Sequence, residues 1–342
     1  MKAIVIAEHG GPEVLRYTDV LEPKLGPTDV LVRVRACALN HLDLWVRRGI
    51  PGVKFPLPRI PGSDIAGEVA KIGEQVKNVQ VGQRVVLAPG VSCNQCEQCL
   101  AGFDNSCRQY TILGYLMDGG CAEYVRVPEV NALPLPESLD FNHAAAVPLV
   151  FLTAWHMLVT RAQLKPGEDV LVLGAGSGVG SAAVQIAKLI GARVIATAGS
   201  DAKLKQAREL GTDEVINHSK DDIAEEVRRL TNRRGVDVVF EHVGAATWEK
   251  SLSSLAHGGR LVTCGATTGP DVKLDIRFLF SRQWSLLGSY MGTRGEVFQV
   301  MKLVGQGKLR PVLDRTFPLR EAAQAHALME KRQQFGKIVL NP

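Results

Sequence analysis

The chain has 342 residues, of which 46% are hydrophobic and 22% are charged, with 34 glycines and 17 prolines. This composition is too apolar for a disordered chain, and it shows neither a collagen-like glycine period nor an internal repeat. A chain of this length exceeds what one core commonly holds, so we expect two domains. The N-terminal apolar run ends too early for a signal peptide and no apolar run is long enough for a membrane span, which predicts a cytoplasmic protein without a membrane partner.

Lysine and arginine number 40 against 35 acidic residues, a net charge of +5. This excess raises the hypothesis of nucleic-acid binding, with the densest basic cluster at residues 228–234. That cluster follows the acidic residues Asp221, Glu225 and Glu226, as is typical of a solvent-facing amphipathic helix. Aromatic residues make up 6% of the chain and no base-stacking motif is present. The composition therefore predicts no nucleic-acid partner.

The first part of the chain is predicted to be rich in strands. Apolar and polar residues alternate at 30–35, and further short strands are expected at 65–72 and 84–87. Glycine and proline punctuate the stretch, for example at Pro61–Gly62. These features predict a small, loop-rich β domain over residues 1–123.

Four of the seven cysteines lie close together, at Cys93, Cys96, Cys99 and Cys107. Two-residue gaps let neighbouring thiolates turn toward one ion, and a fourth ligand closes a tetrahedron. An iron–sulfur cluster and reduced free thiols are the alternatives, whereas an odd cysteine count without a secretion signal argues against disulfides. Zinc is favoured. Because four thiolates leave no open coordination position, residues 90–110 are predicted to form a lobe around one structural zinc.

After residue 167 the period changes, and residues 169–173 form a continuous apolar run of the kind expected for a strand buried on both faces. Strands and helices then alternate, which predicts a doubly wound parallel sheet over residues 124–292. A C-terminal segment, residues 293–342, is predicted to return in part to the first domain. The predicted strands are 169–173, 193–198, 214–216, 236–240, 260–264, 284–289 and 336–340, and the predicted helices are 183–190, 201–210, 221–231, 247–255, 296–305 and 319–331.

A glycine-rich loop lies between the strand at 169–173 and the following helix. Such a loop lets backbone N–H groups approach a pyrophosphate, with the helix N-terminus behind them. A tight turn without a ligand is the alternative, but the position after a strand and at the head of repeated βα units favours dinucleotide binding. The predicted contacts are Gly176, Ser177, Gly178, Val179 and Gly180.

The end of the second strand of this domain bears on the choice of dinucleotide. An acid there would hold the adenosine ribose of NAD, but residues 198–200 read Ala-Gly-Ser, and Asp201 resembles a helix cap. Ser200 and Lys203 are placed to cradle a 2′-phosphate instead. The sequence therefore predicts NADP(H), with NAD(H) as the alternative.

Several motifs, in this order and spacing, resemble the medium-chain dehydrogenase/reductase superfamily over essentially the whole chain. They are Met1–Ile4, Pro61–Val69, the cysteine lobe, Gly119–Tyr124, the glycine loop and Phe335–Val339. The resemblance implies an α/β protein in which a GroES-like catalytic domain with the zinc lobe joins a Rossmann domain at a cleft. It also implies a homodimer or homotetramer.

Zinc alcohol dehydrogenases of that superfamily hold a second, catalytic zinc. Cys37 fits its first ligand, but Ser63 stands where a histidine is expected and Leu149 where the third ligand falls. Leu39 occupies the place of a Ser or Thr proton relay. A thiolate and Asp64 alone do not make a tetrahedral zinc site, so the resemblance implies no catalytic zinc and a small buried strand residue at position 37.

What replaces those features resembles the zinc-independent quinone oxidoreductase and enoyl-reductase branch. Asn40 and Asp43 match its Asn-x-x-Asp segment, which implies catalytic roles: Asn40 as a donor to a developing enolate oxygen and Asp43 as the residue that orients the loop. His218 stands where the branch often has a tyrosine. The resemblance places Thr153, Tyr290 and Met291 beside the nicotinamide, Val243, Gly244, Cys264, Gly265 and Ala266 in the same groove, and Lys337 facing the pyrophosphate.

The favoured function is reduction of a small quinone or α,β-unsaturated carbonyl compound by NADPH without catalytic zinc. One alternative is an alcohol dehydrogenase that interconverts an alcohol with an aldehyde or ketone. A second alternative is a dinucleotide-binding protein without turnover, because the glycine loop alone does not separate binding from catalysis. The sequence identifies no proton donor.

Overall fold

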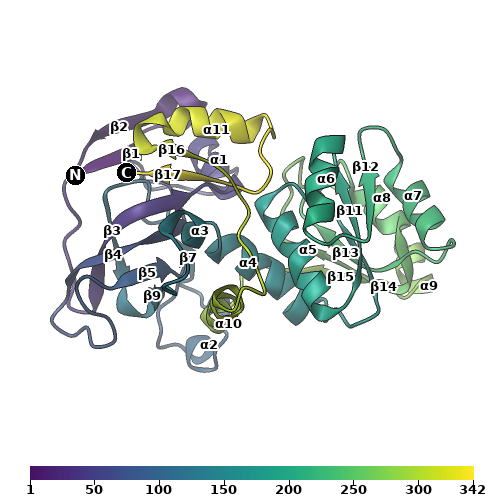
Figure 1. Cartoon of the computed structure of the whole chain (residues 1–342), viewed down its shortest axis with the longest axis horizontal. Helices are drawn as coiled ribbons and strands as arrows, with labels where there is room; N and C mark the ends of the chain where they lie inside the picture. Colours follow the sequence, from purple (N-terminus) through teal and green to yellow (C-terminus); the bar gives the residue numbers. More distant parts are fainter. The chain divides into compact units, whose positions relative to one another are not determined.

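The computed structural model describes all 342 residues. It divides into two compact units, Met1–Leu149 together with Thr293–Pro342, and Val150–Gly292 (Figure 1). The predicted second domain begins at residue 124, but residues 124–149 belong to the first unit. The reason is strand pairing, because β8 (Tyr124–Pro128) pairs with β3 (Asp29–Ala38) and β9 (Ala132–Pro134) with β5 (Arg84–Leu87).

The first unit is built on a seven-stranded sheet in the order β16-β17-β3-β4-β5-β9, with β8 also paired to β3. The alternating valines Val30, Val32 and Val34 of β3 face the core and are at most 3% exposed. The strands from the end of the chain pair with those from its beginning, since β17 lies between β16 and β3. The other elements of this unit are β1 (Lys2–Ile6), β2 (Leu15–Asp19), β4 (Asp64–Ile72), β6 (Gly90–Val91), β7 (Thr111–Ile112), β16 (Leu313–Pro318), β17 (Lys337–Asn341), α1 (His41–Arg48), α2 (Glu97–Leu100), α3 (Phe141–Ala145), α10 (Arg294–Gly305) and α11 (Ala322–Glu330).

The second unit is a six-stranded parallel sheet in the order β12-β11-β10-β13-β14-β15. Its central strand β10 (Asp169–Val172) is buried along its whole length, as the continuous apolar run predicts. The predicted alternation of strands and helices, and with it the Rossmann fold class, is confirmed. The other elements are β11 (Arg193–Ala198), β12 (Glu214–Asn217), β13 (Val236–Glu241), β14 (Leu255–Thr263), β15 (Ser285–Gly288), α4 (Pro148–Trp155), α5 (Gly178–Ile190), α6 (Asp201–Glu209), α7 (Ile223–Leu230), α8 (Trp248–Ser253) and α9 (Ile276–Ser281), with α4 beginning in the last residues of the first unit.

The strand order reverses between β10 and β13. The chain winds outward from β10 to β11 and β12 on one side, and from β13 to β14 and β15 on the other. In an open parallel sheet, ligands bind outside the carboxyl ends of the strands at such a switch point. The glycine loop after β10 and the turn after β13 meet at this point.

One segment differs from the sequence prediction. Residues 41–48 form helix α1 rather than a loop, because Asn40 and Asp43 build a capping box at its N-terminus. The apolar stretch 144–159 is mostly buried, and within it α4 continues into a π-helical turn over His156–Arg161. None of the helices has the length and apolar character that a membrane span requires.

Candidate functional site

The glycine loop presents free backbone donors at the N-terminus of α5. Ser177 caps this helix, and its Oγ accepts the N–H of Gly180 at 2.9 Å. Position 180 requires glycine, because a Cβ there would lie 2.3 Å from a carbonyl oxygen of the loop. The N–H groups of Gly176, Gly178 and Val179 have no hydrogen-bond acceptor within the chain. Donors of this kind at a helix N-terminus fit a phosphate.

Glu241 organises the neighbouring turn, a role that the sequence analysis missed. Its fully buried carboxylate accepts the N–H groups of Val243 and Gly244, both at 3.0 Å, and the hydroxyl of Thr247 at 2.7 Å. The turn that carries Val243 and Gly244 is therefore fixed at the carboxyl end of β13, beside the glycine loop. A glutamate that ends a buried apolar strand was the signal in the sequence.

Cys264, Gly265 and Ala266 follow β14, the next strand of the sheet. The hydroxyl of Thr268, from the same turn, donates to the carbonyl of Val243 at 2.7 Å and joins the turns after β13 and β14. Burial raises the pKa of Cys264 to about 12, so this side chain is a neutral thiol at physiological pH. These residues lie at the same edge of the sheet as the glycine loop.

Three residues predicted to lie beside the nicotinamide also belong to the second unit. Thr153 is 6% exposed, and its buried hydroxyl has no hydrogen-bond partner. A buried hydroxyl without a partner costs free energy, which a ligand's polar group would recover. Met291 is 6% exposed with a φ of 53°, whereas the side chain of Tyr290 is 55% exposed.

The ribose end of the groove carries no carboxylate at the strand terminus, because β11 ends at Ala198. Ser200 caps α6 and its Oγ accepts the N–H of Lys203 at 3.4 Å. The carboxylate of Asp201 is engaged within the chain: it pairs with Lys220 at 2.7 Å and accepts the amide of Asn217 at 2.7 Å. The hydrogen bond from Lys220 lowers the pKa of Asp201, which keeps this contact charged.

In the first unit, Asn40 lies in a buried network rather than facing open space. The ammonium of Lys337 lies 2.8 Å from Oδ2 of Asp64 and 2.5 Å from Oδ1 of Asn40. Asn40 donates from Nδ2 to Asp64 at 3.0 Å and to the carbonyl of Ala38 at 3.4 Å. The second oxygen of Asp64 accepts the N–H of Leu149 at 2.7 Å. The family resemblance implies that Lys337 faces the pyrophosphate, whereas in the structure its side chain is 4% exposed and pairs with Asp64 in the interior.

Asp43 holds the loop that precedes this network. Its carboxylate accepts the N–H groups of Asn40 at 2.7 Å and of Gly62 at 2.9 Å, and the residue is 1% exposed. Burial raises the pKa of Asp43 to about 6, and the two backbone donors oppose that shift. The side chain therefore joins the start of α1 to the segment before β4.

Of the three positions that correspond to a catalytic zinc site, Cys37 and Ser63 are fully buried and Leu149 is half-buried. Cys37 and Cys121 are both 0% exposed, with their Sγ atoms 3.8 Å apart. The Ser63 hydroxyl is buried without a partner, and position 149 contributes only its backbone N–H, to Asp64. The hydrogen bond with Cys121, together with burial, raises the pKa of Cys37 well above that of a free thiol.

The four clustered cysteines converge on one point. Their sulfur atoms all lie within 4.8 Å of one another, and the Cys96–Cys99 and Cys93–Cys107 pairs are 3.5 Å apart. Ligands of a tetrahedral zinc at about 2.3 Å would be about 3.8 Å apart, so the arrangement fits a site of four thiolate ligands. Backbone N–H groups of Gln95 and then Cys96 lower the pKa of Cys93 to about 6, which favours the thiolate that binds metal.

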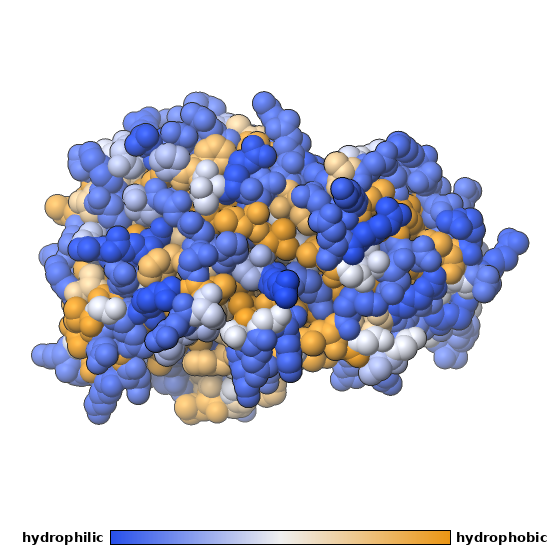
Figure 2. Space-filling model, in the orientation of Figure 1, coloured by the Kyte–Doolittle hydropathy of each residue, from blue (hydrophilic) through white to orange (hydrophobic).

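This cysteine lobe has no apolar interior of its own. Leu100 is 77% exposed and Phe103 is 57% exposed, and Figure 2 shows apolar atoms at the surface where α2 lies. Without a hydrophobic core, a segment of this size depends on another source of folding energy. A bound metal supplies such energy in small metal-binding lobes.

Comparisons with known proteins agree with this architecture. Residues 26–137 match the family described as alcohol dehydrogenase GroES-like domain, and residues 178–306 match zinc-binding dehydrogenase. A crystal structure of an NAD-dependent alcohol dehydrogenase is 49% identical, covers 100% of both chains and superposes with a TM-score of 0.97.

Two curated relatives carry different names. A quinone oxidoreductase of Pseudomonas aeruginosa is 35% identical over 100% of this chain and 99% of its own length. An NAD-dependent alcohol dehydrogenase of Sulfolobus acidocaldarius is 36% identical over 99% of each chain. The similarity spans both units, while the names divide between two reactions.

Proposed function

Because the chain belongs to the medium-chain dehydrogenase/reductase superfamily of nicotinamide-dependent oxidoreductases, we propose that it uses NADPH to reduce a small quinone or an α,β-unsaturated carbonyl compound. The single observation that carries this proposal is the Lys337–Asp64 pair. An internal ammonium lies 2.8 Å from Asp64, one of the two carboxylates near Cys37. The other, Asp43, accepts the backbone N–H groups of Asn40 and Gly62. A second metal ion there would have to displace a buried cation, so the site favours a reaction without catalytic zinc.

Bound NADPH supplies the hydride, and residues of the second unit bind the NADPH. We assign the pyrophosphate to the free N–H groups of Gly176, Gly178 and Val179, with the dipole of α5 behind them. The turns fixed by Glu241 and Thr268 line the groove at the carboxyl ends of β13 and β14. The unpartnered hydroxyl of Thr153 is assigned to the nicotinamide end, with Tyr290 and Met291.

Asn40 and Asp43 take positioning roles in this proposal. Both N–H groups of the Asn40 amide are already used within the chain, and its oxygen accepts from Lys337. An enolate oxygen would therefore have to compete with Asp64 for the same donor. We assign Asn40 and Asp43 to holding the loop between β3 and α1, and Lys337 to neutralising Asp64.

NADP(H) is proposed over NAD(H) on the geometry around Asp201. No acid ends β11, where NAD-binding domains carry the acceptor for the ribose hydroxyls, and the carboxylate of Asp201 already pairs with Lys220 and Asn217. Ser200 and Lys203 lie at the start of α6, where a 2′-phosphate would meet a helix N-terminus. The name of the similar NAD-dependent alcohol dehydrogenases makes NAD(H) the alternative to be measured.

The proposed metal content is one structural zinc per chain, held by Cys93, Cys96, Cys99 and Cys107. We propose a homodimer or homotetramer as the working assembly. Strand β15 is the edge of the parallel sheet, and α9 beside it exposes Ile276 at 65% and Phe280 at 71%. An open strand edge next to exposed apolar side chains is a surface that a second chain would cover.

The test combines metal counting with turnover. Zinc per chain is measured by mass spectrometry on protein purified without added metal, and NADPH oxidation is followed with a panel of quinones and enones. One zinc that is lost in Cys107→Ser and retained in Cys37→Ser, together with turnover in the panel, supports the proposal. Two zinc ions with NAD-linked alcohol oxidation would establish the alcohol dehydrogenase instead. Tight NADPH binding without turnover of any quinone, enone or alcohol would indicate a dinucleotide-binding protein without enzymatic activity.

A further inference from the structure

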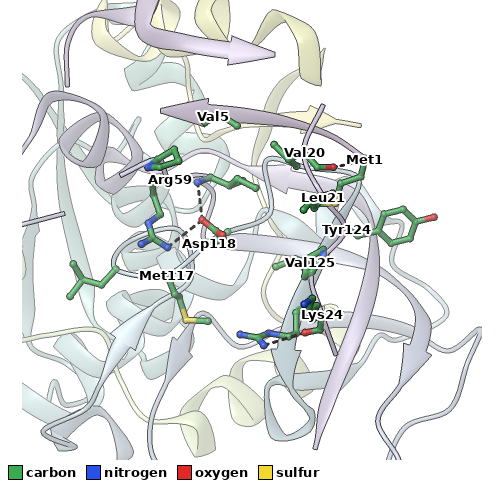
Figure 3. Close-up of a pocket in the computed structure, with 16 residues that line it drawn as sticks. Met1, Val5, Val20, Leu21, Lys24, Arg59, Met117, Asp118, Tyr124 and Val125 are labelled. Atoms are coloured by element: carbon green, nitrogen blue, oxygen red, sulfur yellow. Dashed lines mark hydrogen bonds and ion pairs between the residues drawn. The ribbon is translucent and has the colours of Figure 1, made fainter. Parts of the chain in front are cut away.

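The first unit contains a cavity that shares no residue with the sites described above. It has a volume of about 500 Å³ and lies between β1, residues 20–24 that follow β2, residues 58–60, residues 116–119 and β8 (Figure 3). Cavities of roughly 300–1,000 Å³ are the usual size of small-molecule sites. Every lining residue belongs to the first unit.

One wall of the cavity is apolar. Val125 of β8 is 2% exposed and Ile60 is 8% exposed, and the half-buried Val5 and Val20 complete this wall. Figure 3 shows Val20 and Val125 on the right of the view, Val5 at its top, and the side chain of Met117 to the left of Val125. This surface suits the hydrocarbon part of a ligand.

The wall is held in place by backbone hydrogen bonds, so no rearrangement is needed to form it. Residues Ile6 and Arg59 exchange two bonds of 2.8 and 2.9 Å, and Met1 and Val20 exchange two of 2.9 Å. The N–H of Gly119 donates to the carbonyl of Ile60 at 2.8 Å. A preformed cavity avoids the ordering cost that a flexible loop would add to binding.

The charged residues around the cavity are mostly basic. Lys24, Arg59 and Arg126 line it against one acid, Asp118. Asp118 is already occupied, because it accepts Nη1 of Arg59 at 3.2 Å and the N–H of Ile60 at 3.1 Å.

The other two basic residues differ in their partners. Arg126 has a carboxylate of Asp29 at 3.6 Å, and its Nη1 donates to the carbonyl of Lys24 at 3.2 Å. The ammonium of Lys24 takes part in no ion pair. The edge of the cavity therefore has an uncompensated positive charge beside an apolar wall.

We propose that this cavity binds a small amphipathic anion, a linear acyl carboxylate, with its hydrocarbon tail along Val5, Val20 and Val125 and its head group at Lys24. Such a ligand contacts both halves of the lining, whereas an uncharged hydrocarbon would leave the lysine unused and a purely polar anion would leave the valines exposed. The proposal is independent of the reaction assigned to the dinucleotide groove.

The probe is decanoate, titrated calorimetrically into the full-length protein below its micelle concentration. Decanol, with the same tail but no charge, and decyltrimethylammonium, with the opposite charge, are the matched ligands. We expect saturable binding of one decanoate per chain, at least about tenfold weaker binding of decanol, and none of the cation, because decanol lacks the charge that Lys24 would bind and the cation would be repelled by it.

Two variants test the two halves of the site separately. Lys24→Glu is expected to weaken decanoate at least about tenfold by reversing the charge, whereas Lys308→Glu makes the same charge change at an exposed lysine elsewhere in the unit and leaves binding unchanged. Val20→Trp fills the cavity and is expected to abolish binding of both decanoate and decanol. Thermal unfolding of each variant shows that the fold is retained.

The location is tested with a photoreactive diazirine analogue of decanoate. Crosslinks in residues 20–24, 58–60 or 116–126 that survive saturating NADPH support the proposal. Crosslinks confined to residues 150–292, displacement by NADPH, or equal binding of decanoate by the protein and by Lys24→Glu would overturn it. An acyl compound acting as a substrate at the dinucleotide site would be recognised by that displacement, so this result also separates the two proposals.

Discussion

The carboxylate of Asp104 accepts the backbone N–H of Arg294 at 3.0 Å, across 190 residues of sequence. Asp104 is 5% exposed and lies in the cysteine lobe, and Arg294 is the first residue of α10. The side chain of Arg294 also donates to Asn94 of the lobe at 2.7 Å. The cysteine lobe thus holds the N-terminus of α10, the first helix of the C-terminal part of the first unit.

Replacing this carboxylate is expected to loosen the start of α10. Asp104→Ala removes an acceptor and a negative charge from a helix N-terminus, and should lower the free energy of unfolding by about 1–2 kcal/mol. Hydrogen exchange at residues 294–297 should become faster, while the zinc content stays at the wild-type level. Asp104→Asn keeps an acceptor and is the matched control. Unchanged exchange in Asp104→Ala would show that the lobe does not support the helix.

Removing only one partner of the buried Lys337–Asp64 pair is expected to lower the free energy of unfolding strongly. Lys337→Met leaves the fully buried Asp64 without its cation, which should destabilise the protein by about 3–5 kcal/mol in urea unfolding. Adding Asp64→Asn to that variant should recover part of the loss. The exposed pair Lys2–Asp19 gives the comparison, since Lys2→Met should cost less than about 1 kcal/mol. Equal losses in the two lysine variants would mean that the interior pair is not what holds this region.

The acid sensitivity of the first unit is expected to depend on His326. This side chain is 0% exposed on α11, Arg47 Nη1 contacts its Nδ1 at 3.2 Å, and Glu330 pairs with the same arginine. Burial, and then the charge of Arg47, lower the pKa of His326 to about 3. A folded pKa below that of the unfolded chain means that the unfolded state binds the extra proton. The contribution of neutral His326 to the free energy of unfolding is therefore fully present above about pH 6.5. It is lost as the pH falls toward 3, by up to about 1.4 kcal/mol per pH unit.

Urea unfolding between pH 7 and pH 4 measures this slope, which His326→Gln should flatten. The pKa of Asp43, raised to about 6 by burial, acts in the opposite direction, because a raised acid pKa adds stability as the pH falls through it. Asp43→Asn should therefore steepen the acid loss. The exposed His257 serves as the control, and His257→Gln should keep the wild-type slope. A slope unaffected by His326→Gln would refute the assignment.

A side chain at position 180 is expected to weaken cofactor binding by a steric clash rather than by a change of charge. In Gly180→Ala a Cβ would lie 2.3 Å from a backbone oxygen, so the loop or the start of α5 must shift. We expect NADPH binding to weaken by at least about tenfold, a loss of about 1.4 kcal/mol, measured by fluorescence titration. Gly288→Ala adds the same methyl group where no atom lies within 4 Å, and should bind NADPH as the wild type does. Normal binding by Gly180→Ala would remove the loop from the proposed site.

The second unit was largely predictable because its signals are local. Each of these signals can be recognised within a short stretch of sequence. They are continuous apolar strands such as β10, a glycine loop at a strand end, and the helical periodicity of apolar residues. The cysteine cluster is similar, since spacing alone brings the four thiols near one another. The structure confirms the fold class from these signals.

The network around Asn40 was not predictable in the same way. The Asn-x-x-Asp segment is visible in the sequence, but the partner that decides its role, Lys337, is 297 residues away. Only the pairing of β17 with β3 brings Lys337 to Asn40 and Asp64, and no periodicity reports such a contact. The helix over residues 41–48 was missed because its capping box was interpreted as a catalytic motif.

The placement of β17 has a consequence for how the protein is made. This strand, residues Lys337–Asn341, lies inside the first sheet between β16 and β3, and the second unit is inserted between the two parts of the first. During synthesis the second unit is complete while the last residues of the chain are still in the ribosome. The first unit, although its first strands are made early, has an open position beside β3 until β17 has been synthesised. The first unit, whose N-terminal strands are synthesised first, is therefore the last of the two units to complete its fold.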